Sequence, residues 1–245
     1  MQVDERAPAA LRDAAFVVVF TGAGVSAESG LPTYRSGADG LWKRADFERF
    51  ANPTGYRRHV PESWRWYHSR ARFAATVQPN AAHRAIAEIE RRAREFLLVT
   101  QNIDGLHQRA GSTQVIELHG SLRHATCFDC PATTPWPDDA GEPQCPACGG
   151  LLRPAVVMFH EHLPAGAMEQ ALDAARRCDL LISVGTSSAV WPAAEVPVVA
   201  RAAGAEVWIV NPDVDGQMPE TDRVLHMKGP AGVILPPIVE GAWPG

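Results

Sequence analysis

The apolar run Phe16–Phe20 leads directly into a loop of small residues, Thr21–Gly30. An apolar run that ends in glycines is typical of a buried strand followed by a tight turn. Gly22 and Gly24 lack the Cβ atoms that would keep backbone N–H groups away from a phosphate, and a helix starting near Ser26 would direct its positive end there. The segment therefore predicts a strand–loop–helix junction that binds a phosphate-bearing ligand.

The spacing of Gly22, Gly24 and Ala27 also fits the dinucleotide-binding fingerprint. By itself, this spacing is equally consistent with a plain tight connection. A dehydrogenase of this type has a second strand and an acidic ribose ligand about 20 residues further on. Here the following residues are rich in Gly and Pro, and we interpret Asp46 and Glu48 as surface charge because Lys and Arg surround them. The pattern argues against an ordinary hydride-transferring enzyme.

The composition excludes several classes of protein. A chain of 245 residues with 46% apolar residues can bury a substantial core, as one large domain or as a large and a small one. The net charge of -5 argues against a general nucleic-acid or anionic-membrane surface, because those partners select clustered Lys and Arg. No apolar stretch approaches the length of a membrane helix, and the N-terminus has no signal-peptide pattern. We therefore expect a cytoplasmic protein with no nucleic-acid or membrane partner.

Four of the five cysteines form two Cys-x-x-Cys pairs. Two such pairs on separate turns can present four thiolates tetrahedrally, which is the geometry of structural Zn²⁺. Disulfides are the alternative, but they are disfavoured in a cytosolic chain. With every position taken by sulfur, the ion would stabilise the fold and would not bind substrate. The predicted zinc ligands are Cys127, Cys130, Cys145 and Cys148, whereas Cys178 is predicted to be a buried core thiol.

Apolar runs and helical patterns alternate along the rest of the chain, which predicts an α/β fold with a doubly wound, mostly parallel sheet. Asn80 is the predicted N-cap of one helix, and Glu88 is placed to pair with Arg92 on it. A Pro- and Gly-rich segment extends up to Pro61, before the helix predicted at Glu62–Ala75. The predicted helices are Glu62–Ala75, Asn80–Arg94, Leu163–Arg177, Pro192–Ala203 and Gly232–Val239, and the strands after the first are Phe96–Val99, Val115–Leu118, Leu180–Val184, Glu206–Val210 and Arg223–Met227.

Small or polar residues follow five of these strands, all except Arg223–Met227, and the carboxyl ends of parallel strands meet at one rim where ligands bind. Taken singly, Asn102 and Asp104 would merely cap a helix at Gly105, and a lone histidine is more often structural than catalytic. The coincidence of five strand ends favours a common dinucleotide site with one histidine as base. The rim residues are Thr21–Gly30, Thr100–His107, His119, Gly120, Gly185–Ser188 and Asn211.

These motifs together resemble those of the sirtuin family, the NAD-dependent protein lysine deacylases. The similarity extends from about Ala15 to Pro237 and rests on Gly22–Ser26, Pro32–Arg35, Thr100–Asp104, Leu118–Gly120, the four cysteines, Arg153–Phe159 and Gly185–Ser187. The resemblance implies a Rossmann-like NAD-binding domain made of residues 1–35, 80–120 and 153–245. A helical insertion at 36–79 and a zinc module at 121–152 would form a smaller lobe, with an acyl-lysine protein or peptide bound between the two.

The resemblance also implies a role for the rim residues. Asn102 and Asp104 would hold the nicotinamide ribose and carboxamide, Gln101 would order the ribose, and His119 would accept a proton from the ribose hydroxyls. Nicotinamide would leave, and the acyl group would end on ADP-ribose. The expected cofactor contacts are Gly22, Ala23, Gly24, Ser26, Tyr34, Arg35, Gln101, Asn102, Asp104, Gly185, Thr186, Ser187, Asn211 and Ala231.

Tyr67 and Arg70 lie three residues apart on a predicted helix, so a phenol and a guanidinium share one face and can hold a carboxylate. The pair resembles the Tyr-x-x-Arg of class III sirtuins, which remove succinyl, malonyl and glutaryl groups, and Ala51 matches the small residue that widens their acyl pocket. We expect succinyl and malonyl as well as acetyl groups to be removed, with plain deacetylation as the alternative. The expected substrate contacts are Ala51, Tyr67, Arg70, Val156, Val157 and Phe159.

Three positions depart from the family pattern. Tyr34 stands where the family mostly has Phe, His160 replaces a glycine, and Pro212 restricts the loop after Asn211. His160 would narrow the peptide channel or require a backbone conformation that glycine accepts more easily.

Two other functions stay open. One is protein ADP-ribosyl transfer at the same NAD site. The other is a non-catalytic NAD sensor, against which the presence of His119 argues, because a sensor needs no base. We expect a monomer.

Overall fold

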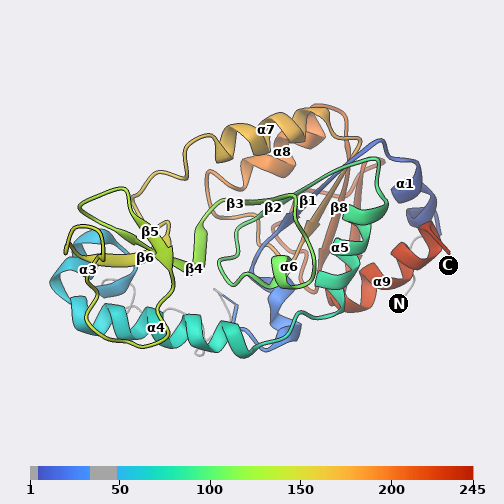
Figure 1. The fold of residues 1–245 in the computed structure, drawn as a ribbon. Coiled ribbons are helices and arrows are strands. Elements are labelled where there is room, and N and C mark those ends of the chain that lie inside the picture. Colours follow the sequence, from blue (N-terminus) through green and yellow to red (C-terminus); the bar gives the residue numbers. More distant parts are fainter. Residues whose placement is uncertain (1–4, 34–48, 245) are drawn as a thin grey trace.

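The computed structural model describes residues 5–33 and 49–244. Its centre is a six-stranded sheet in the order β3-β2-β1-β7-β8-β9, in which every pairing of neighbouring strands is parallel (Figure 1). The predicted fold class is therefore confirmed. The strands are β1 (Phe16–Thr21), β2 (Glu95–Thr100), β3 (Val115–Glu117), β7 (Leu180–Val184), β8 (Glu206–Asn211) and β9 (Val224–Lys228).

Helices cover both faces of this sheet, which explains why its central strands are apolar throughout. Within β1, Val17 and Val19 pack into the core on one face, while Val18 and Phe20 pack into the core on the other. Five longer helices supply the two layers (Figure 1). One layer consists of α1 (Ala7–Asp13), α5 (Ala81–Arg92) and α9 (Ala231–Ala242), and the other of α7 (Ala167–Arg177) and α8 (Glu195–Ala202).

A second, three-stranded antiparallel sheet lies beside the main one, in the order β5-β4-β6 (Figure 1). Its strands are β4 (Gly120–Cys127), β5 (Thr133–Pro135) and β6 (Leu152–Val156). Helices α3 (Pro53–Arg58) and α4 (Val60–Thr76) pack against it: the Tyr56 hydroxyl donates to the Leu152 carbonyl at 3.0 Å, and the Trp64 ring stacks on Trp136 at 4.8 Å. The predicted division of the chain into lobes stays a prediction, and residues 152–156 belong to this small sheet.

Two local features add to the expectation. The helix after β1 is a 3₁₀ helix, Ala23–Ser29, which begins three residues before the predicted start near Ser26. A short helix, α3, forms within the Pro- and Gly-rich segment: Asn52 accepts a hydrogen bond from the Gly55 backbone N–H at 2.8 Å, and Pro53 occupies the first helical position.

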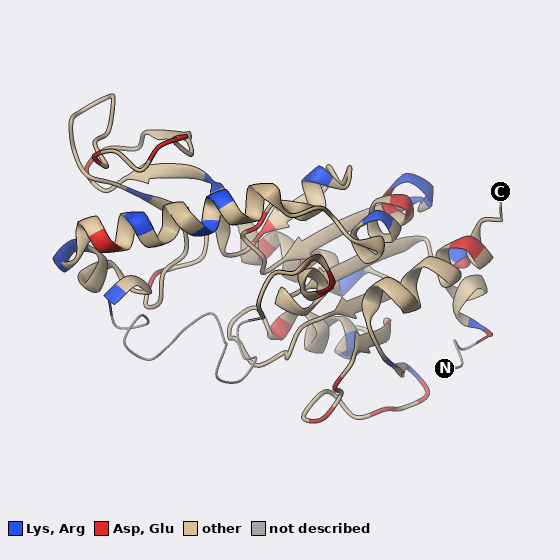
Figure 2. Cartoon of the chain, turned by 90° about the horizontal axis from the view of Figure 1, so that it is seen from below, with Lys and Arg blue, Asp and Glu red and all other residues tan. Residues whose placement is uncertain are grey.

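Other predictions hold, with shifted ends. Asn80 caps α5 by accepting from the backbone N–H of Ala82 at 2.9 Å, and Glu88 accepts from Arg92 at 2.8 Å. Helices α7 and α8 begin later than predicted, at Ala167 and Glu195. Among the described residues, no helix is both long and apolar enough to cross a membrane. Basic side chains are spaced along α4, and both signs of charge occur around the main sheet (Figure 2).

Candidate active site

The glycine loop lies against the loop after β7 at the rim of the main sheet. The Gly22 N–H donates to the Val184 carbonyl at 3.1 Å, and the Gly24 N–H donates to the Gly185 carbonyl at 2.7 Å. A Cβ atom on Gly24 would lie 2.6 Å from the Gly185 oxygen. The structure therefore brings the predicted residues of these two loops together, and the small residues permit that approach.

Ser26 lies at the centre of a buried hydrogen-bond network. Its hydroxyl donates to Asp104 Oδ2 at 2.8 Å and accepts from Asn102 Nδ2 at 3.2 Å. His83 Nδ1 accepts from the Asn80 backbone N–H at 3.3 Å, so His83 Nε2 carries the hydrogen and donates to Ser26 at 3.4 Å. The single donor and both acceptor positions of the hydroxyl are thus used, which fixes the Asn102 amide relative to the glycine loop.

Asp104 anchors its own loop. Burial raises the pKa of its carboxyl, and the hydrogen bonds from the Leu106 N–H and from Ser26 oppose that shift without cancelling it. Oδ1 accepts from the Leu106 N–H at 2.9 Å, at the start of the short helix α6 (Leu106–Arg109). Asp104 therefore caps the start of α6, as one of the two sequence interpretations predicted. It also accepts the hydrogen bond from Ser26.

Two buried histidines lie next to this network with ring centroids 4.8 Å apart: His83, which sequence reasoning missed, and His107, the last residue of the predicted rim segment Thr100–His107. The Thr21 hydroxyl donates to Thr100 Oγ1 at 2.8 Å, so its contact with His107 Nε2 at 3.0 Å is one in which the ring donates. Burial lowers the pKa of His83 to about 4 and that of His107 to about 3, so both rings are neutral. The sequence signal for His107 is its position in the segment after β2, whereas His83 lies on α5, which follows another helix, and has no such signal.

His119 follows β3 and faces the end of β2. Its ring Nδ1 lies 3.0 Å from the Gln101 carbonyl oxygen, which can only accept, so Nδ1 carries the hydrogen and Nε2 keeps a free lone pair. Burial lowers the pKa of the imidazole, and the bond to Gln101 offsets only part of that shift. The ring is therefore a neutral acceptor near pH 7, which is the state a general base requires.

The remaining rim residues join this arrangement through Thr186. Its hydroxyl accepts from Gln101 Nε2 at 3.0 Å, and its carbonyl accepts from Asn211 Nδ2 at 3.4 Å. Ala231 lies at the start of α9, where the next N–H, that of Gly232, donates to Glu28 Oε1 of the glycine loop at 2.8 Å. Ser187 follows Thr186 directly, whereas Tyr34, Arg35, Asp46 and Glu48 lie outside the described residues.

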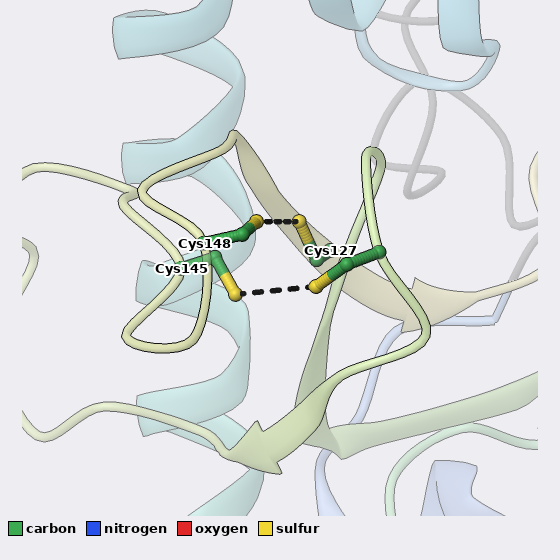
Figure 3. Close-up of side chains that lie close together, drawn as sticks. Cys127, Cys145 and Cys148 are labelled. Carbon is green, nitrogen blue, oxygen red and sulfur yellow. Dashed lines mark hydrogen bonds between the residues drawn. The ribbon is translucent and has the colours of Figure 1, made fainter.

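The four predicted zinc ligands converge. Their Sγ atoms all lie within 4.8 Å of one another, and the pairs Cys127–Cys148 and Cys130–Cys145 are each 3.7 Å apart (Figure 3). A tetrahedral ion with Zn–S bonds of about 2.3 Å requires sulfurs about 3.8 Å apart, so the cluster fits Zn²⁺. Backbone N–H groups of Asp129 and Gly150 donate to two of the sulfurs at 3.3 Å, which stabilises thiolates.

Comparison with known proteins supplies the family. The Sir2 family profile matches residues 22–192. The chain belongs to the Sir2 family. A relative from Pseudomonas aeruginosa, named NAD-dependent protein deacylase 1, is 47% identical over 240 residues that cover 94% of this chain and 95% of the relative.

Two solved structures show the same fold. A Sir2 homologue in complex with NAD is 39% identical and superposes with a TM-score of 0.87, covering 98% of this chain and 94% of the other. A Sir2 complex with a p53 peptide and NAD+ is 30% identical with a TM-score of 0.82, covering 98% of both chains. The Sir2 fold predicted from the motifs is thus confirmed over nearly the whole chain.

The residues predicted to contact substrate gather on the side of the small sheet. Tyr67, Val156 and Met158 share one apolar cluster, and the Phe159 N–H donates to the Ala51 carbonyl at 2.8 Å. The Tyr67 hydroxyl donates to the Phe50 carbonyl at 3.1 Å, and the Arg70 guanidinium lies 4.1 Å from the centroid of the Trp66 ring. The Val157 N–H donates to the His119 carbonyl at 2.9 Å, which connects this region to the histidine.

One departure from the Sir2 pattern has a visible consequence. His160, which replaces a glycine of that pattern, has φ of 70°, and its side chain is exposed. The left-handed conformation that glycine would accept more easily is therefore present, and the side chain projects into solvent. Pro212, the departure next to Asn211, is also exposed.

Proposed function

We propose that this chain is an NAD-dependent protein lysine deacylase in which His119 is the general base. The supporting observation is the hydrogen bond from His119 Nδ1 to the Gln101 carbonyl, which leaves Nε2 as a neutral acceptor. When bound, NAD supplies the ribose carbon that the acyl oxygen attacks and the ribose hydroxyl that receives the acyl group. His119 Nε2 would accept the proton of that hydroxyl, and one water molecule would be consumed as the amide bond to lysine breaks, so that the products are free lysine, nicotinamide and O-acyl-ADP-ribose.

The rim residues hold the cofactor. The glycine loop and the loop after β7 would lie against the phosphates, where their small residues allow close approach of the backbone, while Asn102, Asp104 and Gln101 would orient the nicotinamide ribose. Ser26 supports this arrangement because it bonds both Asn102 and Asp104. The hydrogen bonds among Ser26, Asn102, Asp104 and His83 fix the orientation of these side chains relative to one another.

The acyl group in our proposal includes succinyl and malonyl. Tyr67 and Arg70 lie three residues apart on α4, so they share one face of the helix. Burial raises the pKa of the Tyr67 hydroxyl, which keeps the phenol protonated and able to donate. A phenol donor beside a guanidinium supports a shared carboxylate site. To take part, Tyr67 must turn its hydrogen from the Phe50 carbonyl to the acyl carboxylate.

The substrate is an acyl-lysine protein, bound between a Rossmann-like lobe (1–35, 80–120, 153–245) and a small lobe (36–79, 121–152). The protein acts as a monomer in the cytoplasm, where the cysteine pairs stay reduced and bind zinc.

The test supplies NAD with acetyl-, succinyl- and malonyl-lysine peptides and follows nicotinamide and O-acyl-ADP-ribose by mass spectrometry. We expect Arg70→Met to reduce turnover of succinyl peptide about tenfold or more while acetyl peptide is little affected, since a charge-assisted contact is lost. Arg72→Met, an exposed position on the same helix, is the matched control. Equal losses of turnover on the succinyl and acetyl peptides would contradict the proposed carboxylate site. ADP-ribosylated protein as the main product would favour ADP-ribosyl transfer.

A further inference from the structure

Arg153, which is buried, and Glu161, which is partly exposed, form an ion pair across the segment that follows β6. Arg153 on β6 is only 7% exposed, and both of its terminal nitrogens donate to the Glu161 carboxylate, Nη1 to Oε1 and Nη2 to Oε2, the latter at 2.7 Å. This bidentate geometry fixes the relative orientation of the two groups as well as their separation.

The same two side chains also bind the backbone between them. Arg153 Nη2 donates to the Val156 carbonyl at 2.7 Å, and Glu161 Oε2 accepts from the Met158 N–H at 2.8 Å. Residues 156–161, which we call the substrate loop, are thus held at both ends by one guanidinium and one carboxylate.

The substrate loop touches both sides of the proposed acyl-lysine site. The Val157 N–H donates to the His119 carbonyl at 2.9 Å, and the Phe159 N–H donates to the Ala51 carbonyl at 2.8 Å. A shift of the loop therefore changes the distance between the base and the helical insertion. His119 itself keeps a separate support, because its ring is also bound to the Gln101 carbonyl.

The pair also contacts the zinc module. The Arg153 guanidinium carbon lies 5.0 Å from the centroid of the Phe128 ring, and Phe128 stands between the first two cysteines of the cluster. The same ring also meets Arg57, whose guanidinium carbon lies 3.9 Å from the centroid. The zinc module thus limits the movement of Arg153 and, through it, of Glu161.

We propose that Arg153 and Glu161 are positioning residues that set the geometry of the substrate loop for the acyl-lysine chain. A buried ion pair is weak evidence for stability, because desolvation offsets its attraction, whereas its directional bonds define one loop conformation. This inference rests on the proposed function, because the loop matters to catalysis only if an acyl-lysine lies against it.

The test compares Glu161→Gln and Arg153→Lys with Glu240→Gln, an exposed control on α9. We expect Glu161→Gln to raise KM for an acetyl-lysine peptide about tenfold, with a smaller change in kcat, while Kd for NAD from calorimetry stays within about twofold. Arg153→Lys keeps the positive charge but cannot form the bidentate hydrogen bonds of a guanidinium, so we expect a smaller increase in peptide KM.

The outcomes distinguish a positioning role of Arg153 and Glu161 from a general contribution to folding and from no role in peptide binding. An unchanged peptide KM in both variants would overturn the inference, as would a rise in the NAD Kd equal to the rise in peptide KM, because a general loss of folding moves both. If Glu161→Gln does not fold, the milder Arg153→Lys gives the result. Failure of the wild-type protein to turn over any acyl peptide would overturn the proposed function as well, so the two failures are distinguishable.

Discussion

The Gly24 N–H donates to the Gly185 carbonyl at 2.7 Å, so the loops after β1 and β7 meet backbone to backbone. A Cβ atom on Gly24 would lie 2.6 Å from that oxygen, and one on Gly185 would lie 2.2 Å from the Val25 nitrogen. The sequence explains Gly24 by the approach of a phosphate. The structure adds a second reason, since the two loops that form the proposed NAD site cannot approach each other with side chains between them.

Gly185→Ala should therefore destabilise the protein by about 2–4 kcal/mol, the sum of a backbone clash and of a left-handed residue at φ 60°. Gly204→Ala is the matched control, because Gly204 has φ of 100° with nothing within 4 Å of its Cβ position, so it carries the conformational cost alone. Urea denaturation measures both. A Gly185→Ala variant that loses no more stability than Gly204→Ala would show that the loops can move apart.

The burial of His119 predicts how the reaction depends on pH. Because burial lowers the pKa of the ring, the base stays deprotonated to a lower pH than a solvent-exposed histidine. We expect kcat/KM to fall as pH decreases, with a midpoint below about 6.5. His119→Ala should retain NAD binding and lose turnover. A midpoint above that of free histidine, or an active His119→Ala variant, would assign the base to another group.

Local patterns predicted most of what positions the site. The rim residues Gln101, Thr186 and Asn211 were found because parallel strands deliver the residues that follow them to one edge, and the strands themselves have strong apolar runs. The zinc ligands were found because their spacing is nearly sufficient to define a tetrahedral site.

What the sequence did not predict depends on contacts between distant segments. His83 lies on α5, which follows no predicted strand, and only the packing of that helix brings its ring to Ser26 and to the ring of His107. The short helix α3 was missed because six residues are too few to show a helical period. The role of Gly185 depends on a contact with a loop about 160 residues earlier in the chain, for which no local pattern exists.

Removal of zinc should unfold the small sheet while the main sheet persists. The cluster joins the end of β4 to the segment before β6, and few apolar side chains hold these together otherwise. We expect Cys148→Ser to bind less than one zinc per chain by atomic absorption and to lower the melting temperature. Cys178→Ser is the control, because Cys178 is buried against α7 and donates to the Ala175 carbonyl at 3.5 Å. Equal zinc content in the two variants would contradict the assignment.

The Glu161 carboxyl predicts how stability depends on pH. Burial raises its pKa, but the hydrogen bonds from Arg153 and Met158 outweigh burial, so the folded pKa lies below the usual value. The stabilisation is therefore complete above the unfolded pKa of about 4.3 and is lost as pH falls through the lower folded value. The difference in unfolding free energy between wild type and Glu161→Gln should shrink on going from about pH 6 to about pH 3. A difference that grows toward low pH would contradict this sign.

His160 offers a test of strain in the substrate loop. Among the described residues other than glycine, only His160 and Ser188 have positive φ, at 70° and 50°. A left-handed residue with a Cβ costs about 1–2 kcal/mol, while glycine adds about 0.5–1 kcal/mol of unfolded-state entropy. His160→Gly should therefore stabilise the protein by up to about 1 kcal/mol. His162→Gly, the same exchange at an exposed position without positive φ, should destabilise it by a similar amount. If denaturation shows a loss in both variants, the loop at His160 stores no strain, and the glycine of the Sir2 pattern serves the approach of the substrate instead.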